Sequence, residues 1–297
     1  MNAILKCWIP LFNALGILAI LQGCASKGPP RVKVAPTIVT PTQIADLVFH
    51  SNTEWERWGK RVVRAMPGSP TCLVQADGSC EVVAEGCGDE QTRALCPIVN
   101  TYWANVSNGK AGHSCNLNDV CEVKWPPGDT RSFEMTAAWS AAFVSTMLKK
   151  AKFSTSEFWP SGVHAEYIFA ARDGYASAFE VVPIPAYPQV GDIICANRVL
   201  EPKPGEQRRR PLKPEEIFQI RANGPAMHCD IVVQVDLTSK MVHAIGGNVQ
   251  QTVARTLTPL DDQGLLQYNA DSGRPWMLVM RARRSSSAPQ PLSGNPG

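Results

Sequence analysis

A serine and two histidines stand in sequence contexts that could support acyl transfer. Ser140 lies in the run FEMTAAWSAAFVSTMLKKA, which is rich in helix formers. With Thr136 as a plausible N-cap, Ser140 falls in the first turn of this helix, where unpaired backbone amides and the helix dipole favour a nucleophile and an oxyanion. His228 starts the apolar run HCDIVVQV, and His243 lies in the run MVHAIGGNV. Ser140, a histidine that takes its proton, and a group that orients this histidine would form a hydrolase site.

Short apolar runs in the second half of the chain predict the strands that position these histidines. Residues 188–195 (PQVGDIIC) have the pattern of a turn followed by an apolar strand. Turn residues 236–240 separate the runs that contain His228 and His243, which predicts a β-hairpin. Side chains two apart on a strand share a face, so Asp230 should lie beside His228.

The N-terminal half predicts helices that pack on these strands. Thr40 and Pro41 indicate a helix start, since Thr suits the cap and Pro the first helical position. Apolar residues recur mostly at steps of three and four from Ile44 to Val62, so one face of this segment should be buried. A short helix is also expected over 97–106, with its aromatic residues turned inward.

The order of these motifs resembles the NlpC-type peptidoglycan hydrolases of the papain-like superfamily. In that family a helix carries the catalytic cysteine, a PGDLV strand follows, and the base begins a later strand. WSAAFVS aligns Ser140 with the catalytic cysteine, and Gly191-Asp192-Ile193 matches the second motif. The resemblance assigns the general base to His228 and the orienting residue to His243, with Asp230 and Asn248 as alternates for the orienting residue.

Five motifs together resemble more closely an uncharacterised bacterial lipoprotein domain family, a divergent member of that group. They are WSAAF, HxxYI at 164–168, GDIIC, HCDIVV and IGGNV. The resemblance covers roughly Pro41 to Arg283 and implies one α+β domain over 41–283. Its core would be papain-like, with N-terminal helices on an antiparallel sheet and a cysteine-rich insertion at 72–121. Trp139, His164 and Tyr167 would line the substrate groove.

The implied activity is cleavage of an amide in the stem peptides of peptidoglycan by Ser/His acyl transfer. A thiol ionises near pH 8.5, whereas a serine hydroxyl must lose its proton during attack. Ser140 is therefore either a working nucleophile or an inactive replacement for the cysteine. The alternative function is a non-catalytic envelope lipoprotein that binds wall peptides or a protein partner through the same groove.

The first 24 residues resemble a bacterial lipoprotein signal. Lys6 precedes a short apolar stretch that ends in Leu21-Gln22-Gly23-Cys24, and so short a stretch is typical of export rather than of a spanning helix. The resemblance implies removal of 1–23 and a lipid on Cys24, with 24–40 as a tether. Ala25 after the cysteine favours the outer membrane, facing the periplasm. The tail over 284–297, Ser/Pro/Gly-rich, is expected to be disordered.

The cysteines divide into two groups. Six cysteines lie within a segment rich in Gly, Asn and Asp, and in an oxidising periplasm they predict up to three disulfides: Cys72, Cys80, Cys87, Cys96, Cys115 and Cys121. Their spacing contains no Cys-x-x-Cys pair, so no metal is expected, and the sequence does not choose among the fifteen pairings. Cys195 and Cys229 are expected to be buried thiols.

Composition excludes several other classes of protein. A net charge of +3 is too small to indicate a nucleic-acid partner. With 24 Pro and 22 Gly along the chain, a coiled coil or helical solenoid is disfavoured. No cofactor is expected, and the expected partners are peptidoglycan or wall peptides and, through Cys24, a membrane.

Overall fold

The computed structural model describes residues 32–65, 72–81, 89, 95–106, 138–198, 212–219, 225–270, 272 and 274–285. The expected signal peptide, Cys24, most of the tether, Thr136 and the tail after 285 lie outside these ranges.

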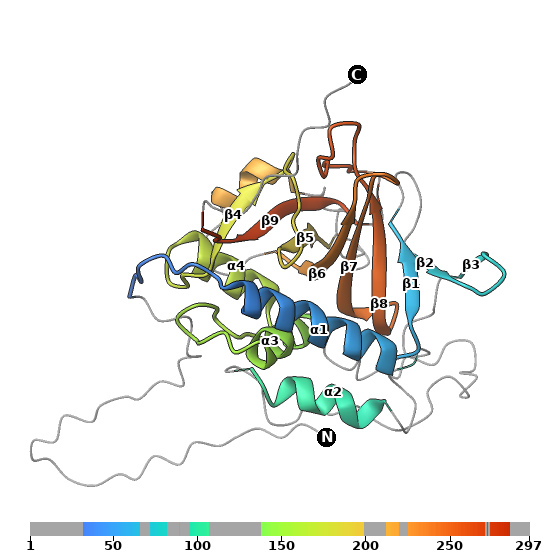
Figure 1. The fold of residues 1–297 in the computed structure, drawn as a ribbon, viewed down its shortest axis with the longest axis horizontal. Coiled ribbons are helices and arrows are strands. Elements are labelled where there is room, and N and C mark those ends of the chain that lie inside the picture. Colours follow the sequence, from blue (N-terminus) through green and yellow to red (C-terminus); the bar gives the residue numbers. More distant parts are fainter. Residues whose placement is uncertain are drawn as a thin grey trace, which may run out of the picture.

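Helix α1 (Pro41–Arg57) begins where the sequence predicts it. The Thr40 hydroxyl accepts a hydrogen bond from the Gln43 amide, and the Gln43 side chain accepts one from the Thr40 amide, which completes a capping box. Helices α3 (Ser140–Lys150) and α4 (His164–Arg172) lie with α1 against the sheet, and α2 (Cys96–Trp103) packs on α3 (Figure 1). The helices predicted around Ser140 and over 97–106 are confirmed as α3 and α2, but the N-cap of α3 is Trp139 and not Thr136 as expected.

Nine strands form one sheet in the order β3-β2-β1-β8-β7-β6-β5-β9-β4. Their ladders are antiparallel except for the parallel pair of β1 and β8, so the sheet is mixed and not antiparallel throughout as expected. The short 3-10 helix η3 (Pro214–Phe218) lies against β4. The strands are β1 (Arg61–Arg64), β2 (Cys72–Val74), β3 (Cys80–Glu81), β4 (Phe179–Pro183), β5 (Ile193–Asn197), β6 (Met227–Asp236), β7 (Met241–Val249), β8 (Thr252–Pro259) and β9 (Trp276–Ala282).

The central strands bury side chains on both faces of the sheet. Ile193 and Ile231 belong to the main core beneath the helices, whereas Ile194 and Val232 belong to a second core on the opposite face. Alternation of side chains along each strand produces this division. Burial on both faces explains the apolar runs at the start of β5 and over 231–233 of β6.

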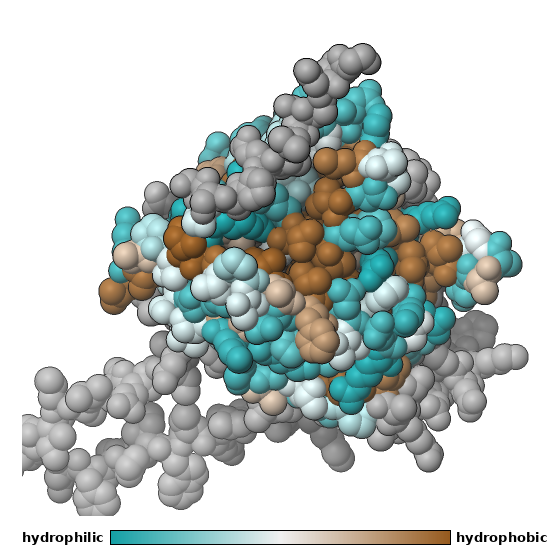
Figure 2. All heavy atoms as spheres, in the orientation of Figure 1, coloured by the Kyte–Doolittle hydropathy of each residue, from teal (hydrophilic) through white to brown (hydrophobic). Residues whose placement is uncertain are grey.

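The surface over α1 is partly hydrophobic. Figure 2 shows hydrophobic side chains gathered above this helix, with hydrophilic ones around them. Phe49, Tyr187 and Leu237 are among the large apolar residues that remain exposed. None of the described helices is long and apolar enough to span a membrane.

Two disulfides join described cysteines. Cys72 pairs with Cys80 across the β2–β3 hairpin, as expected for the first group of cysteines. Cys195 pairs with Cys229, so the expectation of two buried free thiols is wrong. The two residues lie directly opposite each other on antiparallel strands β5 and β6, with Cα atoms 4.1 Å apart. Cys87, Cys115 and Cys121 lie outside the described residues, as does the side chain of Cys96.

Candidate active site

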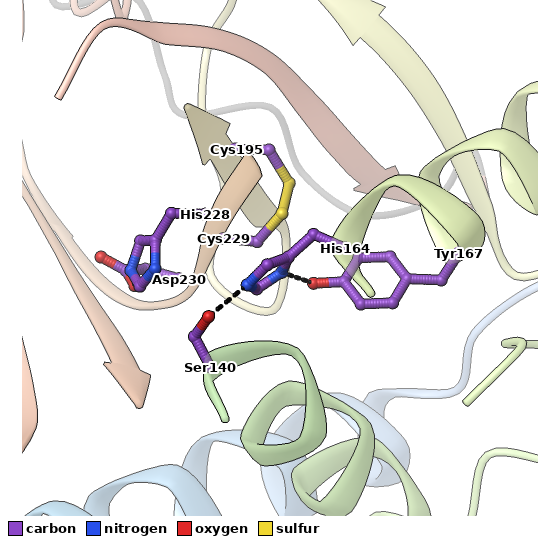
Figure 3. The surroundings of a disulfide bond; sticks show 7 residues. All are labelled: Ser140, His164, Tyr167, Cys195, His228, Cys229 and Asp230. Carbon is purple, nitrogen blue, oxygen red and sulfur yellow. Dashed lines mark hydrogen bonds and ion pairs between the residues drawn. A yellow bond between two sulfur atoms is a disulfide. The ribbon is translucent and has the colours of Figure 1, made fainter. Parts of the chain in front are cut away.

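Polar residues from three of the sequence motifs meet where α3 and α4 begin, beside strand β6 (Figure 3). Ser140 is the first residue of α3, and His164 is the first residue of α4. The pairing of β5 with β6 places His228 opposite Ala196, next to the Cys195–Cys229 disulfide. Segments that are far apart in the sequence therefore bring a serine and two histidines into one buried site.

Ser140, His164 and Tyr167 form a continuous hydrogen-bonded chain, which we call the neutral chain. Ser140 Oγ lies 2.6 Å from His164 Nε2, and His164 Nδ1 is hydrogen-bonded to the Tyr167 hydroxyl. His164 and Tyr167 are three residues apart, which places them on the same side of α4. In the Nδ1–H tautomer, Ser140 donates to Nε2 and Nδ1 donates to the Tyr167 oxygen.

Burial keeps this chain uncharged. It lowers the pKa of His164 well below its ordinary value, and the charge of Arg198, with that of His228 when His228 is protonated, acts in the same direction. Burial, with Asp230 nearby, raises the pKa of Tyr167 well above its ordinary value. At neutral pH His164 is therefore an unprotonated imidazole that can accept the Ser140 proton.

His228, Asp230 and Arg274 form the second set, which we call the charged chain. His228 Nε2 lies 2.7 Å from Asp230 Oδ1, and Arg274 donates to Asp230 Oδ2 at 2.6 Å. Thr256 Oγ1 donates to the same Oδ2 at 2.8 Å. This fully buried carboxylate therefore has partners at both of its oxygens, as a buried charge requires.

The charged chain contains an ionised aspartate and a neutral histidine. Burial alone would raise the pKa of Asp230, but His228 and Arg274 outweigh it and lower this pKa. Burial also lowers the pKa of His228 to about 4, although Asp230 opposes this shift. With Nε2–H donating to Asp230, Nδ1 of His228 remains an acceptor.

Two consecutive glycines of β7 allow both chains to pack closely. A Cβ added at Gly246 would overlap Asp230 Oδ1, and one added at Gly247 would overlap Phe143 and Trp139. The strand can pass between the charged chain and helix α3 only without side chains there. Close packing therefore requires glycine at both positions of the IGGNV motif.

The hydrogen bonds differ from the expected pairing of Ser140 with His228. Ser140 is bonded to His164, and His228 is bonded to Asp230. The two imidazole rings are nevertheless neighbours, with centroids 5.6 Å apart.

His243 does not orient His228, contrary to the expectation. It lies opposite Gln234 near the hairpin turn, six residues along β6 from His228, which corresponds to roughly 20 Å. Its charged neighbours are Arg255 and Asp236, and its Nδ1 has no hydrogen-bond partner in the described part of the chain. The alternate Asp230 makes the hydrogen bond that was assigned to His243.

The expected groove residues are buried instead of lining an open surface. Trp139 is fully buried and stacks against Trp58 and Tyr102, with ring centroids 5.2 and 5.5 Å apart. His164 and Tyr167 are buried in the neutral chain. A pocket with a cavity volume of about 140 Å³ lies on the His228 side, and its polar lining is Asn197, Arg198, His228, Asn248, Gln250 and Arg274.

Sequence reasoning missed three residues of this site. Arg274 contacts Asp230 from 44 positions away, Thr256 comes from β8, and Arg198 follows β5. No spacing or motif ties them to the histidines. The described residues contain no group of three or more His, Cys, Asp or Glu side chains that could hold a metal ion.

Comparison with protein families identifies the domain. A family model described as "Uncharacterized protein conserved in bacteria (DUF2272)" matches residues 92–282, which is more than half of the chain. This chain belongs to the DUF2272 family. The match contains both hydrogen-bonded chains and leaves out α1 and β1–β3. No curated protein and no solved structure matches the sequence. The two disulfides and the bacterial family are compatible with a location outside the cytoplasm.

Proposed function

We propose that this DUF2272 domain is a serine hydrolase that cleaves an amide by acyl transfer, with Ser140 as the nucleophile. The observation that carries the proposal is the 2.6 Å contact between Ser140 Oγ and His164 Nε2 at the start of α3. This distance is within the range expected for a nucleophile and its base. The hydrogen bond from His164 to Tyr167 supplies the third, orienting group.

In the proposed reaction, Ser140 Oγ attacks the carbonyl carbon while its proton moves to His164 Nε2. His164 then gives this proton to the leaving nitrogen as the C–N bond breaks, which leaves an acyl ester on Ser140. Water then attacks the ester carbon while His164 Nε2 takes its proton. The bond between Ser140 Oγ and the acyl carbon breaks, the carboxylic acid leaves, and Ser140 regains a proton from His164. The amides in the first turn of α3 lack acceptors within the helix, so they can stabilise the oxyanion.

His228 supports the same proposal from the other side. It lines the pocket, and its Nε2 is fixed by Asp230. Its unprotonated Nδ1 can accept a hydrogen bond from the substrate. A nucleophile at a helix start with a histidine at a strand start is also the arrangement that the NlpC resemblance implies.

The proposed substrate is a peptidoglycan stem peptide, and the proposed location is the outer membrane, facing the periplasm. The lipobox ending at Cys24 supports lipid anchoring, and the disulfide-bonded cysteines suit an oxidising compartment.

Burial of the nucleophile favours a second candidate, a binding protein without turnover. Ser140 and His164 are only 2% and 5% exposed, and the pocket is lined by His228 and not by Ser140. In this case the two chains would only shape a site that binds wall peptides or an envelope protein.

Incubation with purified sacculi separates the two candidates. Protein lacking residues 1–24 should release new stem-peptide termini, detected by mass spectrometry. Ser140→Ala should abolish this release. Ser145→Ala, on the same helix and bonded through its hydroxyl to Ser161, should retain it. Wall binding without new termini, in both parent and Ser140→Ala, would instead establish the binding protein.

A further inference from the structure

The pocket beside His228 carries an excess of positive charge. Arg274 is neutralised by its ion pair with Asp230, whereas the exposed guanidinium of Arg198 has no ion-pair partner among the described residues. The charge of Arg198 nevertheless reaches the site, because it helps to lower the pKa of His164, His228 and Arg274. None of the described residues that line the pocket is acidic.

The backbone holds Arg198 at this position. Its amide donates to the Ala226 carbonyl at 2.7 Å. The neighbouring Asn197 side chain donates to the same carbonyl and accepts from the Leu212 amide. Asn197 is therefore a structural clamp that fixes the backbone at Arg198, beside the pocket that Arg198 lines.

The turn between β7 and β8 forms another part of the pocket lining. Asn248 and Gln250 line the pocket with φ of 53° and 51°, and Gln251 follows with φ of 61°. The two glutamines are the central residues of the β7–β8 turn between the paired Val249 and Thr252, where positive φ is usual, whereas Asn248 lies at the register shift before that turn. This turn presents the half-buried Asn248 side chain, whose amide makes no hydrogen bond within the described residues.

We propose that this pocket binds a carboxylate group of the ligand. Arg198 supplies the ion pair and Asn248 an amide donor, while Arg274 lies behind them. Guanidinium groups suit carboxylates because they donate two parallel hydrogen bonds. In combination with the proposed function, on which this reading rests, the preferred substrate carries a free carboxylate close to the amide that is cut.

Binding of N-acetyl-alanine tests the site without requiring turnover. Its D and L forms and the corresponding primary amides would be titrated into isotope-labelled protein and followed by NMR. The acid should shift signals of the pocket and bind at least ten times more tightly than the amide. Inorganic phosphate, titrated in parallel, should bind more weakly than the acid.

Variants locate the site. Arg198→Gln should weaken binding of the acid about tenfold or more, and Asn248→Asp, which keeps the shape and adds a negative charge, should also weaken it. Arg64→Gln on β1, another exposed arginine, should bind the acid as the parent does. Equal binding of acid and amide, tighter binding of phosphate, or unchanged binding in Arg198→Gln would overturn the proposal.

Ser140→Ala separates this proposal from the proposed function. This variant should lose hydrolysis of sacculi but bind the acid normally. If the parent binds the acid but does not hydrolyse sacculi, the carboxylate site is supported and the hydrolase is ruled out. If the parent hydrolyses sacculi but binds the acid and the amide equally tightly, the hydrolase is supported and the carboxylate site is ruled out.

Discussion

Two buried histidines, 5.6 Å apart, are held in different ways. His164 lies between the hydroxyls of Ser140 and Tyr167, so the neutral chain contains no ion pair. His228 lies against Asp230, which binds Arg274, so the charged chain is built on a buried ion pair. Burial lowers the pKa of both histidines, yet only His164 contacts a nucleophile. The partner of each imidazole, more than its burial, therefore determines what it can do.

Asp230→Asn should give the largest effect. It would leave the buried Arg274 charge without its partner, and breaking a buried ion pair in this way costs about 3–5 kcal/mol. Urea unfolding measures the loss. Asp236→Asn, near the exposed end of the same strand, is the matched control and should unfold at nearly the same urea concentration as the parent. Equal losses in the two variants would show that the charged chain does not hold the fold.

Acid should destabilise the protein through both histidines. The unfolded chain gains a proton on His228 near pH 6.5, whereas the folded protein gains it only near a pKa of about 4. The contribution of His228 to stability is therefore complete above pH 6.5 and falls by roughly 3 kcal/mol as the pH drops from 6.5 towards 4, whereas Asp192, whose pKa burial raises to about 6, acts in the opposite direction over part of this range.

Unfolding titrations over this pH range check the sign of the effect. His228→Gln should show a shallower decline than the parent, and His164→Gln should do the same, because the pKa of His164 is also lowered. If the stability of both variants falls with pH as steeply as that of the parent, groups other than these histidines cause the fall.

The Cys195–Cys229 disulfide should affect the two chains unequally. Cys229 is the backbone neighbour of His228 on β6, with its side chain on the opposite face of the strand, whereas Ser140 and His164 lie on separate helices. Replacing both cysteines by alanine should cost about 2–4 kcal/mol and shift the imidazole NMR signals of His228 more than those of His164. Larger shifts at His164 would reverse the comparison. In unreduced parent protein, alkylation should not modify either cysteine even after denaturation.

Tyr167→Phe should have the smallest effect. Removal of one hydroxyl leaves His164 Nδ1 buried without its partner, which costs about 1–3 kcal/mol and less than Asp230→Asn. Tyr175→Phe, just beyond α4 and half-buried, is the control and should be close to neutral. If both variants unfold at the same urea concentration, Tyr167 does not support His164.

Local signals in the sequence predicted the elements of the site well. The Thr40 cap, the strand after Gly191 and the β6–β7 hairpin all occur where expected. The hairpin also explains the error at His243. Its turn fixes the register, so His243 must lie opposite Gln234, far from His228. Counting residues back from the turn would therefore have excluded a contact between His228 and His243.

Contacts between distant segments could not be predicted in the same way. His164 meets Ser140 because α3 and α4 both begin at the sheet, and Arg274 reaches Asp230 from the loop before β9. The parallel pairing of β1 with β8 likewise depends on how the chain returns to the sheet. The Cys195–Cys229 bond follows from strand register, because only the pairing of β5 with β6 places these cysteines opposite each other.

Labelling by a fluorophosphonate tests most directly whether the neutral chain activates Ser140, because it requires no known substrate. Mass spectrometry of the folded protein should find the adduct on Ser140, and Ser140→Ala should remain unlabelled. His164→Gln should slow labelling by roughly 100-fold or more, the contribution of a general base, and His228→Gln should slow it much less. Absence of an adduct on Ser140 in the folded parent, or an unchanged rate in His164→Gln, would contradict the account.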